Sequence, residues 1–232
     1  MIINSKRSAV VITAGGSGLR MGGNVKKQYV ELSGKPVLYY SIKFFCDMGF
    51  SNIILTLPEE DLNFVRENIL IQEDFKNVAT VAGGRTRHHS IYNGLKKLKN
   101  IEYVFIHDGV RPLVTGRIMI DLYNMLDSDN NIGVIPVLPV KDTLKKIKDG
   151  FIEGTLDRKD IVAVQTPQAF PFEKIMEAYS RFENELEEFT DDAAIYEKAG
   201  YKVKTVKGDY RNIKITTNED LQMCEFIKTK MR

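Results

Sequence analysis

The sequence predicts an α/β protein with a mostly parallel, Rossmann-like sheet, helices on both of its faces and a protruding β-arm. Short runs rich in β-branched residues alternate with segments whose apolar residues recur every three or four positions, which is typical of βαβ units. This alternation stops at about Leu138 and resumes near Pro171, which predicts the arm. The length of 232 residues suits a single domain over 1–232, with 139–164 as an arm subdomain within it.

The first part of the chain gives a signal for each element in turn. Its predicted strands are apolar throughout, as expected for strands that helices cover on both sides. In Val37–Met48 the residues Leu38, Ile42 and Phe45 fall on one helical face, and Pro58 followed by two glutamates is typical of a helix start. In order, we expect strand Ala9–Thr13, helix Val37–Met48, strand Asn52–Leu57, a helix from Pro58, strand Val78–Ala82, helix Ser90–Lys99, strand Tyr103–His107, helix Gly116–Leu126 and strand Gly133–Val137.

The stretch from Val140 to Val164 has no helical period. Two runs, Thr143–Ile147 and Phe151–Leu156, flank Asp149-Gly150, a dipeptide that favours a tight hairpin turn. A lone two-stranded hairpin is marginally stable in water, so we expect this arm to pack on another surface, most often a second subunit.

The helix and strand alternation resumes after the arm. Thr190 is placed to cap a helix and Gly200 to end it, while Thr217–Asp220 resembles a capping box. The acidic run at 183–188 is interpreted as a solvated helix end. The expected elements are helix Pro171–Phe182, helix Thr190–Ala199, strand Tyr201–Val206 and a last helix from Thr217.

Composition and charge argue against several classes of protein. Lys and Arg number 33 and Asp and Glu 31, so the net charge of +2 lacks the basic excess of a nucleic-acid binder. No apolar run approaches the ~20 residues that span a bilayer, and no apolar stretch of a secretory signal follows Met1. The two cysteines, Cys46 and Cys224, lie far apart and suit the reducing cytoplasm. We expect a cytoplasmic protein that binds neither nucleic acid nor membrane.

A glycine-rich loop, Ala14-Gly15-Gly16-Ser17-Gly18-Leu19-Arg20-Met21-Gly22, follows the first predicted strand. Glycines let backbone N–H groups face an anion, and Arg20, Lys26 and Lys27 add positive charge. The loop is not a dinucleotide fingerprint, since Met21 stands where that motif needs its third glycine, and it is not a P-loop. It predicts a site for the phosphates of a nucleotide, with a plain surface turn as the alternative.

Asp108 comes directly after the fourth predicted strand, at the sheet edge where open parallel sheets bind ligands. A carboxylate beside a triphosphate commonly meets Mg²⁺, which prefers oxygen ligands, so we expect Asp108 to contact the metal or the substrate. A turn-forming aspartate is the alternative. His107 is expected to pack beneath this loop, and His88 and His89, adjacent on a helix, to point in different directions.

Further short motifs, or blocks, are spread along nearly the whole chain. They are Lys27-Gln28-Tyr29, Gly83-Gly84 with Arg87 and Ser90, His107–Pro112, Lys141-Asp142-Thr143, Asp157-Arg158, Gln165–Phe170, Thr190-Asp191-Asp192 and Asn212–Thr216. Together with the glycine-rich loop, they resemble the nucleotidyltransferases that make nucleotide-diphospho sugars and polyols. The order and spacing of the blocks are most similar to those of the 2-C-methyl-D-erythritol 4-phosphate cytidylyltransferase family.

The resemblance implies that a phosphate oxygen of a polyol phosphate attacks the α-phosphorus of CTP and expels pyrophosphate, with Mg²⁺ as cofactor. No serine or cysteine lies in a nucleophile motif, so direct displacement is expected. The residues implied as catalytic are Arg20, Lys27, Arg158 and Lys214. Those implied to bind the nucleotide are Ala14, Gly15, Gly16, Gly18, Gly84, Arg85, Ser90 and Asp108. Those implied to bind the acceptor substrate are Asp108, Arg111, Thr143, Arg158 and Thr190.

The resemblance also implies a homodimer in which the arms interlock, so that Thr143 and Arg158 reach the acceptor in the partner's pocket. Lys214 is expected in a late strand. The chain departs from the family pattern at Lys26, where proline is common, and at Arg85, where some relatives carry an acid. Ser90 either caps a helix or meets the cytosine. Two alternatives remain: a ribitol-5-phosphate cytidylyltransferase, which shares several blocks, and a non-catalytic nucleotide-sensing module.

Overall fold

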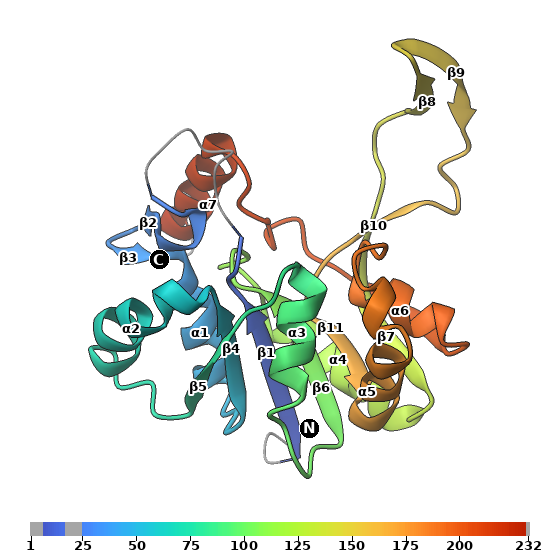
Figure 1. The fold of residues 1–232 in the computed structure, drawn as a ribbon. Coiled ribbons are helices and arrows are strands. Elements are labelled where there is room, and N and C mark those ends of the chain that lie inside the picture. The colour runs from blue at the N-terminus through green and yellow to red at the C-terminus, as the bar shows by residue number, and fades with distance from the viewer. Residues whose placement is uncertain (1–6, 17–24, 231–232) are drawn as a thin grey trace.

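The computed structural model describes residues 7–16 and 25–230, and within them eight strands form one sheet (Figure 1). The strand order is β10-β7-β11-β6-β1-β4-β5, and β12 also pairs with β7. The strands are β1 (Ser8–Thr13), β4 (Ile53–Leu57), β5 (Val78–Ala82), β6 (Tyr103–Asp108), β7 (Ile132–Pro139), β10 (Val162–Val164), β11 (Gln168–Pro171) and β12 (Lys202–Lys207). The pairings among β1, β4, β5 and β6 and that of β12 with β7 are parallel, whereas β10 and β11 run antiparallel. The predicted mostly parallel sheet is confirmed.

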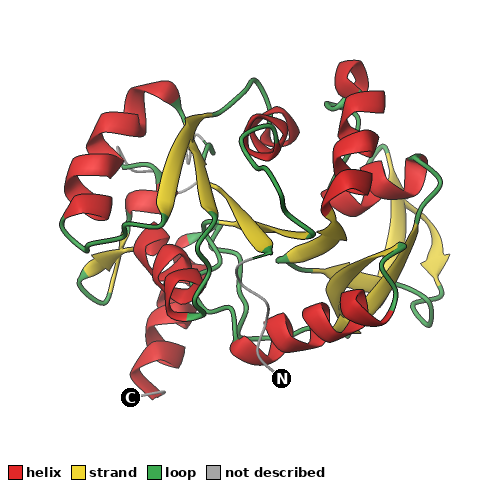
Figure 2. Ribbon diagram, turned by 90° about the horizontal axis from the view of Figure 1, so that it is seen from below, coloured by secondary structure: helices red, strands yellow, loops and turns green. Residues whose placement is uncertain are grey.

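Helices lie on both sides of the sheet, as Figure 2 shows. The helices are α1 (Val37–Asp47), α2 (Leu62–Val65), α3 (Arg87–Leu95), α4 (Gly116–Ser128), α5 (Phe172–Arg181), α6 (Asp192–Lys198) and α7 (Asn218–Lys230). The short α2 follows a 3₁₀ turn at Glu59–Asp61 and continues as a π-helix over Arg66–Ile71. A hairpin of β2 (Glu31–Leu32) and β3 (Lys35–Pro36) precedes α1. None of the described helices is both long and apolar enough to cross a bilayer.

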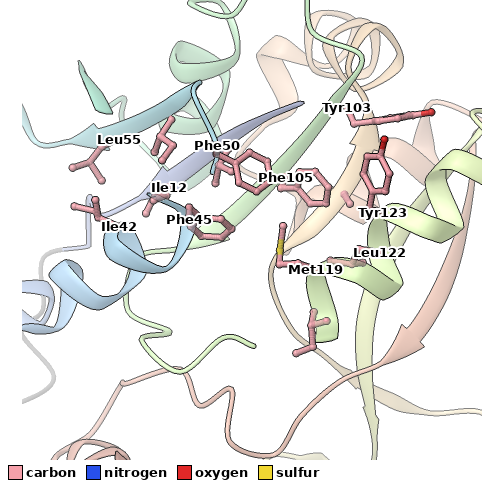
Figure 3. Close-up of a cluster of buried hydrophobic side chains, with 14 of the residues drawn as sticks. Ile12, Ile42, Phe45, Phe50, Leu55, Tyr103, Phe105, Met119, Leu122 and Tyr123 are labelled. Carbon is pink, nitrogen blue, oxygen red and sulfur yellow. The ribbon is translucent and has the colours of Figure 1, made fainter. Parts of the chain in front are cut away.

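The alternation of side chains along β1 divides the core between the two faces of the sheet. Val10 and Ile12 pack with residues of α1 and α4, in the cluster that Figure 3 shows. Ala9 and Val11 pack instead with residues of α3, α5 and α6. Because both faces of β1 are buried, its carboxyl end is fixed in position, and the loop that follows it starts from a rigid support.

The predicted hairpin of the arm is confirmed. Strands β8 (Leu144–Lys148) and β9 (Phe151–Leu156) pair antiparallel around Asp149-Gly150, both with positive φ, and project from the sheet (Figure 1). Phe151 on this hairpin is 78% exposed. The predicted arm extends too far at its end, because residues 162–164 return to the main sheet as β10 on β7.

Several local predictions are wrong. The helix α3 begins at Arg87 rather than Ser90, because the Thr86 side chain caps it by accepting a hydrogen bond from His89 N at 3.4 Å. Likewise Asp191, and not Thr190, caps α6 through Ala194 N at 3.0 Å. The capping box at the start of α7 is confirmed, since Asp220 N donates to Thr217 Oγ1 and Thr217 N donates to the Asp220 carboxylate.

Candidate functional site

A pocket opens at the carboxyl ends of β1, β5 and β6, the edge at which the sequence predicted ligand binding. Five separate segments of the chain meet there. The lining residues are Thr13, Ala14, Gly15, Gly16, Lys27, Gln28, Gly84, Arg85, Thr86, Arg87, Ser90, Asp108, Val110 and Lys214. Most of the predicted nucleotide-binding residues, together with the predicted catalytic Lys27 and Lys214, therefore share one cavity.

The start of the glycine-rich loop and the turn that carries Lys27 lie against each other. A methyl group added at Gly16 would come within 3.3 Å of Lys27 Cε and 3.7 Å of its Nζ, so the lysine amine lies beside the loop backbone. Gln28, fully buried, donates from Nε2 to Ala14 O at 3.0 Å and ties the two segments together. The predicted residues Gly18 and Arg20 lie outside the described residues.

Lys26, the neighbour of Lys27, does not line the pocket. Its amine pairs with Asp61 at 2.8 Å and with Glu60 at 3.0 Å, and Tyr29 donates to the same Asp61 at 2.9 Å. The two adjacent lysines thus take different environments: Lys27 faces the cavity and Lys26 faces the acids at the start of α2. Lys26 therefore places its charge beside Glu60 and Asp61 and not in the pocket.

Gly83 and Gly84 follow β5 directly, and Gly84 forms part of the pocket surface. A methyl group on Gly84 would lie 2.5 Å from His89 Cβ, and one on Gly83 would lie 2.9 Å from Ser90 Oγ, so both positions need glycine. Ser90 Oγ accepts a hydrogen bond from Gly84 N at 2.9 Å and donates to Thr86 O at 2.9 Å. Ser90 therefore shapes this surface from inside α3, and its contact with a base stays a prediction.

Arg85 projects toward the acidic run rather than into the cavity. Its guanidinium pairs with Glu187 at 2.7 Å, which leaves its backbone for any contact in the pocket. Two further acids of the run pair with bases on other elements, Glu183 with Lys96 and Glu185 with Lys198. The run is exposed, as predicted, but it links α3 and α6 through surface pairs instead of ending a helix.

Asp108 stands at the centre of a group of cations on the pocket floor. Its Oδ1 accepts from Arg87 Nε at 3.0 Å, and its Oδ2 from Lys214 Nζ at 2.9 Å and Arg111 Nε at 3.5 Å. Burial by itself would raise the pKa of this carboxyl, but Arg87, Lys214 and Arg111 outweigh it and hold the pKa well below its usual range. Asp108 is therefore ionised and orients the cations around it.

This arrangement does not fit a magnesium ion held by Asp108. In the described part of the chain Asp108 is the one carboxylate that lines the pocket, and both of its oxygens already accept from cations. No group of three or more His, Cys, Asp or Glu side chains is placed to hold a metal among the described residues. Both oxygens of Asp108 are ion-paired in this structure, so its role as a metal ligand stays a prediction.

A buried polar layer supports the floor from below. His107 is fully buried, which lowers its pKa to about 3, and its ring nitrogens lie 3.2 Å from Thr166 Oγ1 and 3.2 Å from Arg111 O. Thr166 Oγ1 in turn accepts from Asp108 N at 3.1 Å. His107 thus packs beneath the loop, as the sequence suggested.

Lys214 lies in an extended segment with no strand pairing, so its predicted strand is wrong. Side chains from elsewhere fix the segment: Asn212 Nδ2 donates to Thr166 O at 2.8 Å, and Arg111 Nη1 donates to Asn212 O at 2.8 Å. Arg111 is largely buried in this role, and its contact with substrate stays a prediction. These bonds bring the Lys214 amine to the pocket without a sheet.

Three predicted acceptor-binding residues lie apart from the pocket within this chain. Thr143 and Arg158 belong to the exposed arm, where the Arg158 guanidinium donates to Lys141 O, and Thr190 is exposed before α6.

The sequence did not single out Gln28 and Thr86 as pocket residues, and it gave Arg87 only a minor role beside the base. The blocks that contain Gln28 and Arg87 were visible, but their contacts depend on partners far along the chain.

Asp108 gives a pH prediction for folding stability. Its folded pKa is depressed, so its stabilising contribution is complete above the unfolded value of ~3.9 and is lost as the pH falls below it. The wild-type chain should therefore unfold at a higher temperature than Asp108→Asn near neutral pH, and the gap should narrow below pH ~4. Thermal melts of both chains from pH 3 to 7 measure this. A difference in melting temperature between the two chains that stays constant over that range would contradict a stabilising role for the ion pairs of Asp108.

Comparison with known proteins gives one consistent result. The family model for 2-C-methyl-D-erythritol 4-phosphate cytidylyltransferase (IspD) matches residues 8–230. The protein of that name from Clostridium perfringens is 41% identical over 223 residues, with 94% of this chain and 97% of the relative covered. The crystal structure of 4-diphosphocytidyl-2C-methyl-D-erythritol synthase from Anaerococcus prevotii superposes with a TM-score of 0.83 at 33% identity, covering 98% of both chains. The Francisella tularensis cytidylyltransferase superposes with a TM-score of 0.81 at 30% identity, covering 95% of this chain and 99% of that one.

Proposed function

This chain belongs to the 2-C-methyl-D-erythritol 4-phosphate cytidylyltransferase family, and from that membership we propose the chemistry of its pocket. The chain is a nucleotidyltransferase that joins CTP and 2-C-methyl-D-erythritol 4-phosphate to give 4-diphosphocytidyl-2-C-methyl-D-erythritol and pyrophosphate, a step in isoprenoid precursor synthesis. One observation carries the assignment to this pocket: Gly15 and Gly16 from the start of the glycine-rich loop, Gly84, Asp108 and Lys214 line one cavity.

The reaction brings two polyanions together, so the pocket must supply positive charge. An oxygen of the acceptor phosphate bonds to the α-phosphorus of CTP while the bond from that phosphorus to the bridging oxygen breaks, and pyrophosphate leaves with the electron pair. Negative charge grows on the α-phosphate in the transition state, where a fixed cation stabilises it most. Lys27, which lies beside Gly16, is the described residue best placed for this role.

The base, the nucleotide phosphates and the acceptor phosphate are assigned to different parts of the pocket. We assign the base to the surface at Gly83 and Gly84 and the nucleotide phosphates to Gly15 and Gly16, whose backbone can approach an anion closely. The acceptor phosphate is assigned to the cationic floor, where Asp108 holds Lys214 at 2.9 Å. Because the protein offers no fitting set of metal ligands among the described residues, any Mg²⁺ is assigned to the nucleotide's own phosphates, with which it enters.

The arm supplies the remaining part of the proposal, a homodimer. Ile147, Phe151 and Ile152 expose apolar surface on a hairpin that is too thin to bury it alone. Thr143 and Arg158 lie on the same arm, away from their own chain's pocket. An isologous pairing of two arms would cover the apolar residues and bring Arg158 and Thr143 to the partner's acceptor. The unpaired cysteines Cys46 and Cys224 suit the proposed cytoplasmic location.

The acceptor is tested by measuring pyrophosphate release with CTP and either 2-C-methyl-D-erythritol 4-phosphate or ribitol 5-phosphate, side by side. We expect turnover with the first and little with the second. Equal or better turnover with ribitol 5-phosphate would assign the alternative acceptor. Binding of CTP without pyrophosphate release from either acceptor would assign a nucleotide-sensing module instead.

The base surface gives a further prediction. Gly84→Ala places a methyl group 2.5 Å from His89 Cβ, so the Gly84 backbone must shift away from α3 and change the pocket surface assigned to the base. We expect the KM for CTP to rise about tenfold or more, which corresponds to ~1.4 kcal/mol of lost binding. Steady-state kinetics with varied CTP measure this change. Gly116→Ala is the control, because a methyl group there meets only Met48 Sδ, at an ordinary contact distance of 3.8 Å. An unchanged KM in the Gly84 variant would place the base elsewhere.

A further inference from the structure

A second carboxylate lies behind the pocket floor, on the far side of Arg87. Asp192, the first residue of α6, is 0% exposed. Its Oδ2 accepts from Arg87 Nη1 at 2.9 Å, and its Oδ1 accepts from the Tyr179 hydroxyl at 2.5 Å. Arg87 Nε meanwhile donates to Asp108 Oδ1 at 3.0 Å. One guanidinium thus bridges a carboxylate that lines the pocket and a carboxylate that does not.

The surroundings of this bridge keep the Tyr179 phenol protonated and shield the ion pair of Arg87 and Asp192 from solvent. Burial, together with Asp192, raises the pKa of Tyr179, so its phenol stays protonated and donates. The Asp192 side chain is fully buried and that of Arg87 is only 26% exposed, so the pair is shielded from solvent and from screening by salt. Helices α5 and α6 therefore hold Arg87 Nη1 through Asp192, while Arg87 Nε donates to Asp108.

The balance of charge explains why the floor needs Asp192. Three cations, Arg87, Arg111 and Lys214, surround the single carboxylate of Asp108. Asp192 neutralises part of this excess and keeps Arg87 Nη1 turned away from Asp108. The Asp108 Oδ2 atom then remains available to Lys214 at 2.9 Å.

We propose that Asp192 is a positioning residue for the transfer reaction, acting through Arg87 to hold Asp108 and, beyond it, Lys214 in place. The inference rests on the proposed function of the pocket and adds a residue outside it. Without the Asp192 carboxylate, the Arg87 guanidinium has only Asp108 as an anionic partner and can fork onto both of its oxygens. Lys214 then loses its place at Oδ2, and the acceptor phosphate loses the cation that orients it.

The variant Asp192→Asn keeps the shape of the side chain and removes its charge. We expect kcat to fall about 10- to 100-fold, since a small misplacement of a reacting group costs rates of this order. The KM for CTP should change less than about threefold, because the Gly16 and Gly84 surfaces are intact. Tyr179→Phe removes one hydrogen bond from Asp192 and should lower kcat in the same direction by a smaller factor.

A double-mutant cycle with Arg87→Gln separates positioning from a general structural role. If Asp192 acts through Arg87, then Asp192→Asn should lower kcat less than about twofold further in the Arg87→Gln chain, and the same holds for Tyr179→Phe. If Asp192→Asn instead lowers kcat by the same factor in the Arg87→Gln chain as in the wild-type chain, the inference is overturned. If Asp192→Asn folds poorly, the same cycle is measured with Tyr179→Phe alone, which leaves both charges in place.

Gly200→Ala is the matched control for the stability of α6. Gly200 follows that helix with φ of +95°, so alanine strains the helix end without touching a charge. It should lower the melting temperature while kcat stays within about twofold of wild type. If this control loses as much kcat as Asp192→Asn, then helix stability explains the effect and the inference fails. An inactive wild-type chain with CTP and the acceptor would instead refute the proposed function, so the two failures are distinguishable.

Discussion

Lys27→Ala is expected to lower kcat by about 10²- to 10³-fold while it weakens CTP binding far less. The Lys27 side chain lies against Gly16, beside the loop assigned to the nucleotide phosphates. A cation in that position stabilises the α-phosphate most strongly in the transition state, when its negative charge is greatest. Single-turnover rates at saturating substrates and CTP binding by calorimetry measure the two effects separately.

Lys26→Ala provides the matched control for this variant. It removes a lysine from the adjacent position, but one that pairs with Glu60 and Asp61 and does not line the pocket. We expect its kcat to stay within several-fold of wild type. Near-normal turnover in the Lys27 variant, or equal losses in both variants, would contradict the assignment of Lys27 to the transition state.

Arg158→Ala is expected to have a comparably large effect on turnover, about 10²-fold or more, without loss of folding stability. Its guanidinium is exposed in the single chain, so truncation removes no buried contact. In the proposed dimer the same group binds the acceptor phosphate in the partner's pocket and holds it for attack. Turnover measured with the acceptor varied, beside a thermal melt, checks both parts of the prediction.

Lys159→Ala, a change of one exposed cation at the next position of the arm, serves as its control. It should retain both turnover and melting temperature. If Arg158→Ala retains normal turnover as well, then the arm does not contribute this residue to catalysis.

The sequence predicted the sheet well because its central parallel strands, β1, β4 and β6, are mostly apolar. Ala9–Thr13 and Tyr103–His107 were recognisable as strands buried on both faces, and the helices between strands followed from apolar periodicity. The strand Gln168–Pro171 was missed, since it is short, contains polar residues and ends in proline. It is stabilised by antiparallel pairing with β6, which local sequence does not reveal.

The site was predictable where its signals are local and not where they depend on distant contacts. The glycines and Lys27 follow one strand, and Asp108 follows another, so their meeting at one sheet edge could be expected. The partners of Asp108 could not, because Arg87 also bridges to Asp192, 105 residues away. These contacts give Asp108 an ion-paired setting that its position after a strand does not reveal.

In the proposed dimer, each active pocket combines one chain's Lys27 with the arm of its partner. Mixing Arg158→Ala chains with Lys27→Ala chains tests this most directly, because each homodimer should be nearly inactive. If the pocket is shared, a mixed dimer has one pocket with both defects and one with neither, so activity should return to about a quarter of wild type after complete exchange in equal amounts. If Arg158 acts in its own chain, every pocket in the mixture carries a defect, and no recovery despite proven subunit exchange would contradict the account.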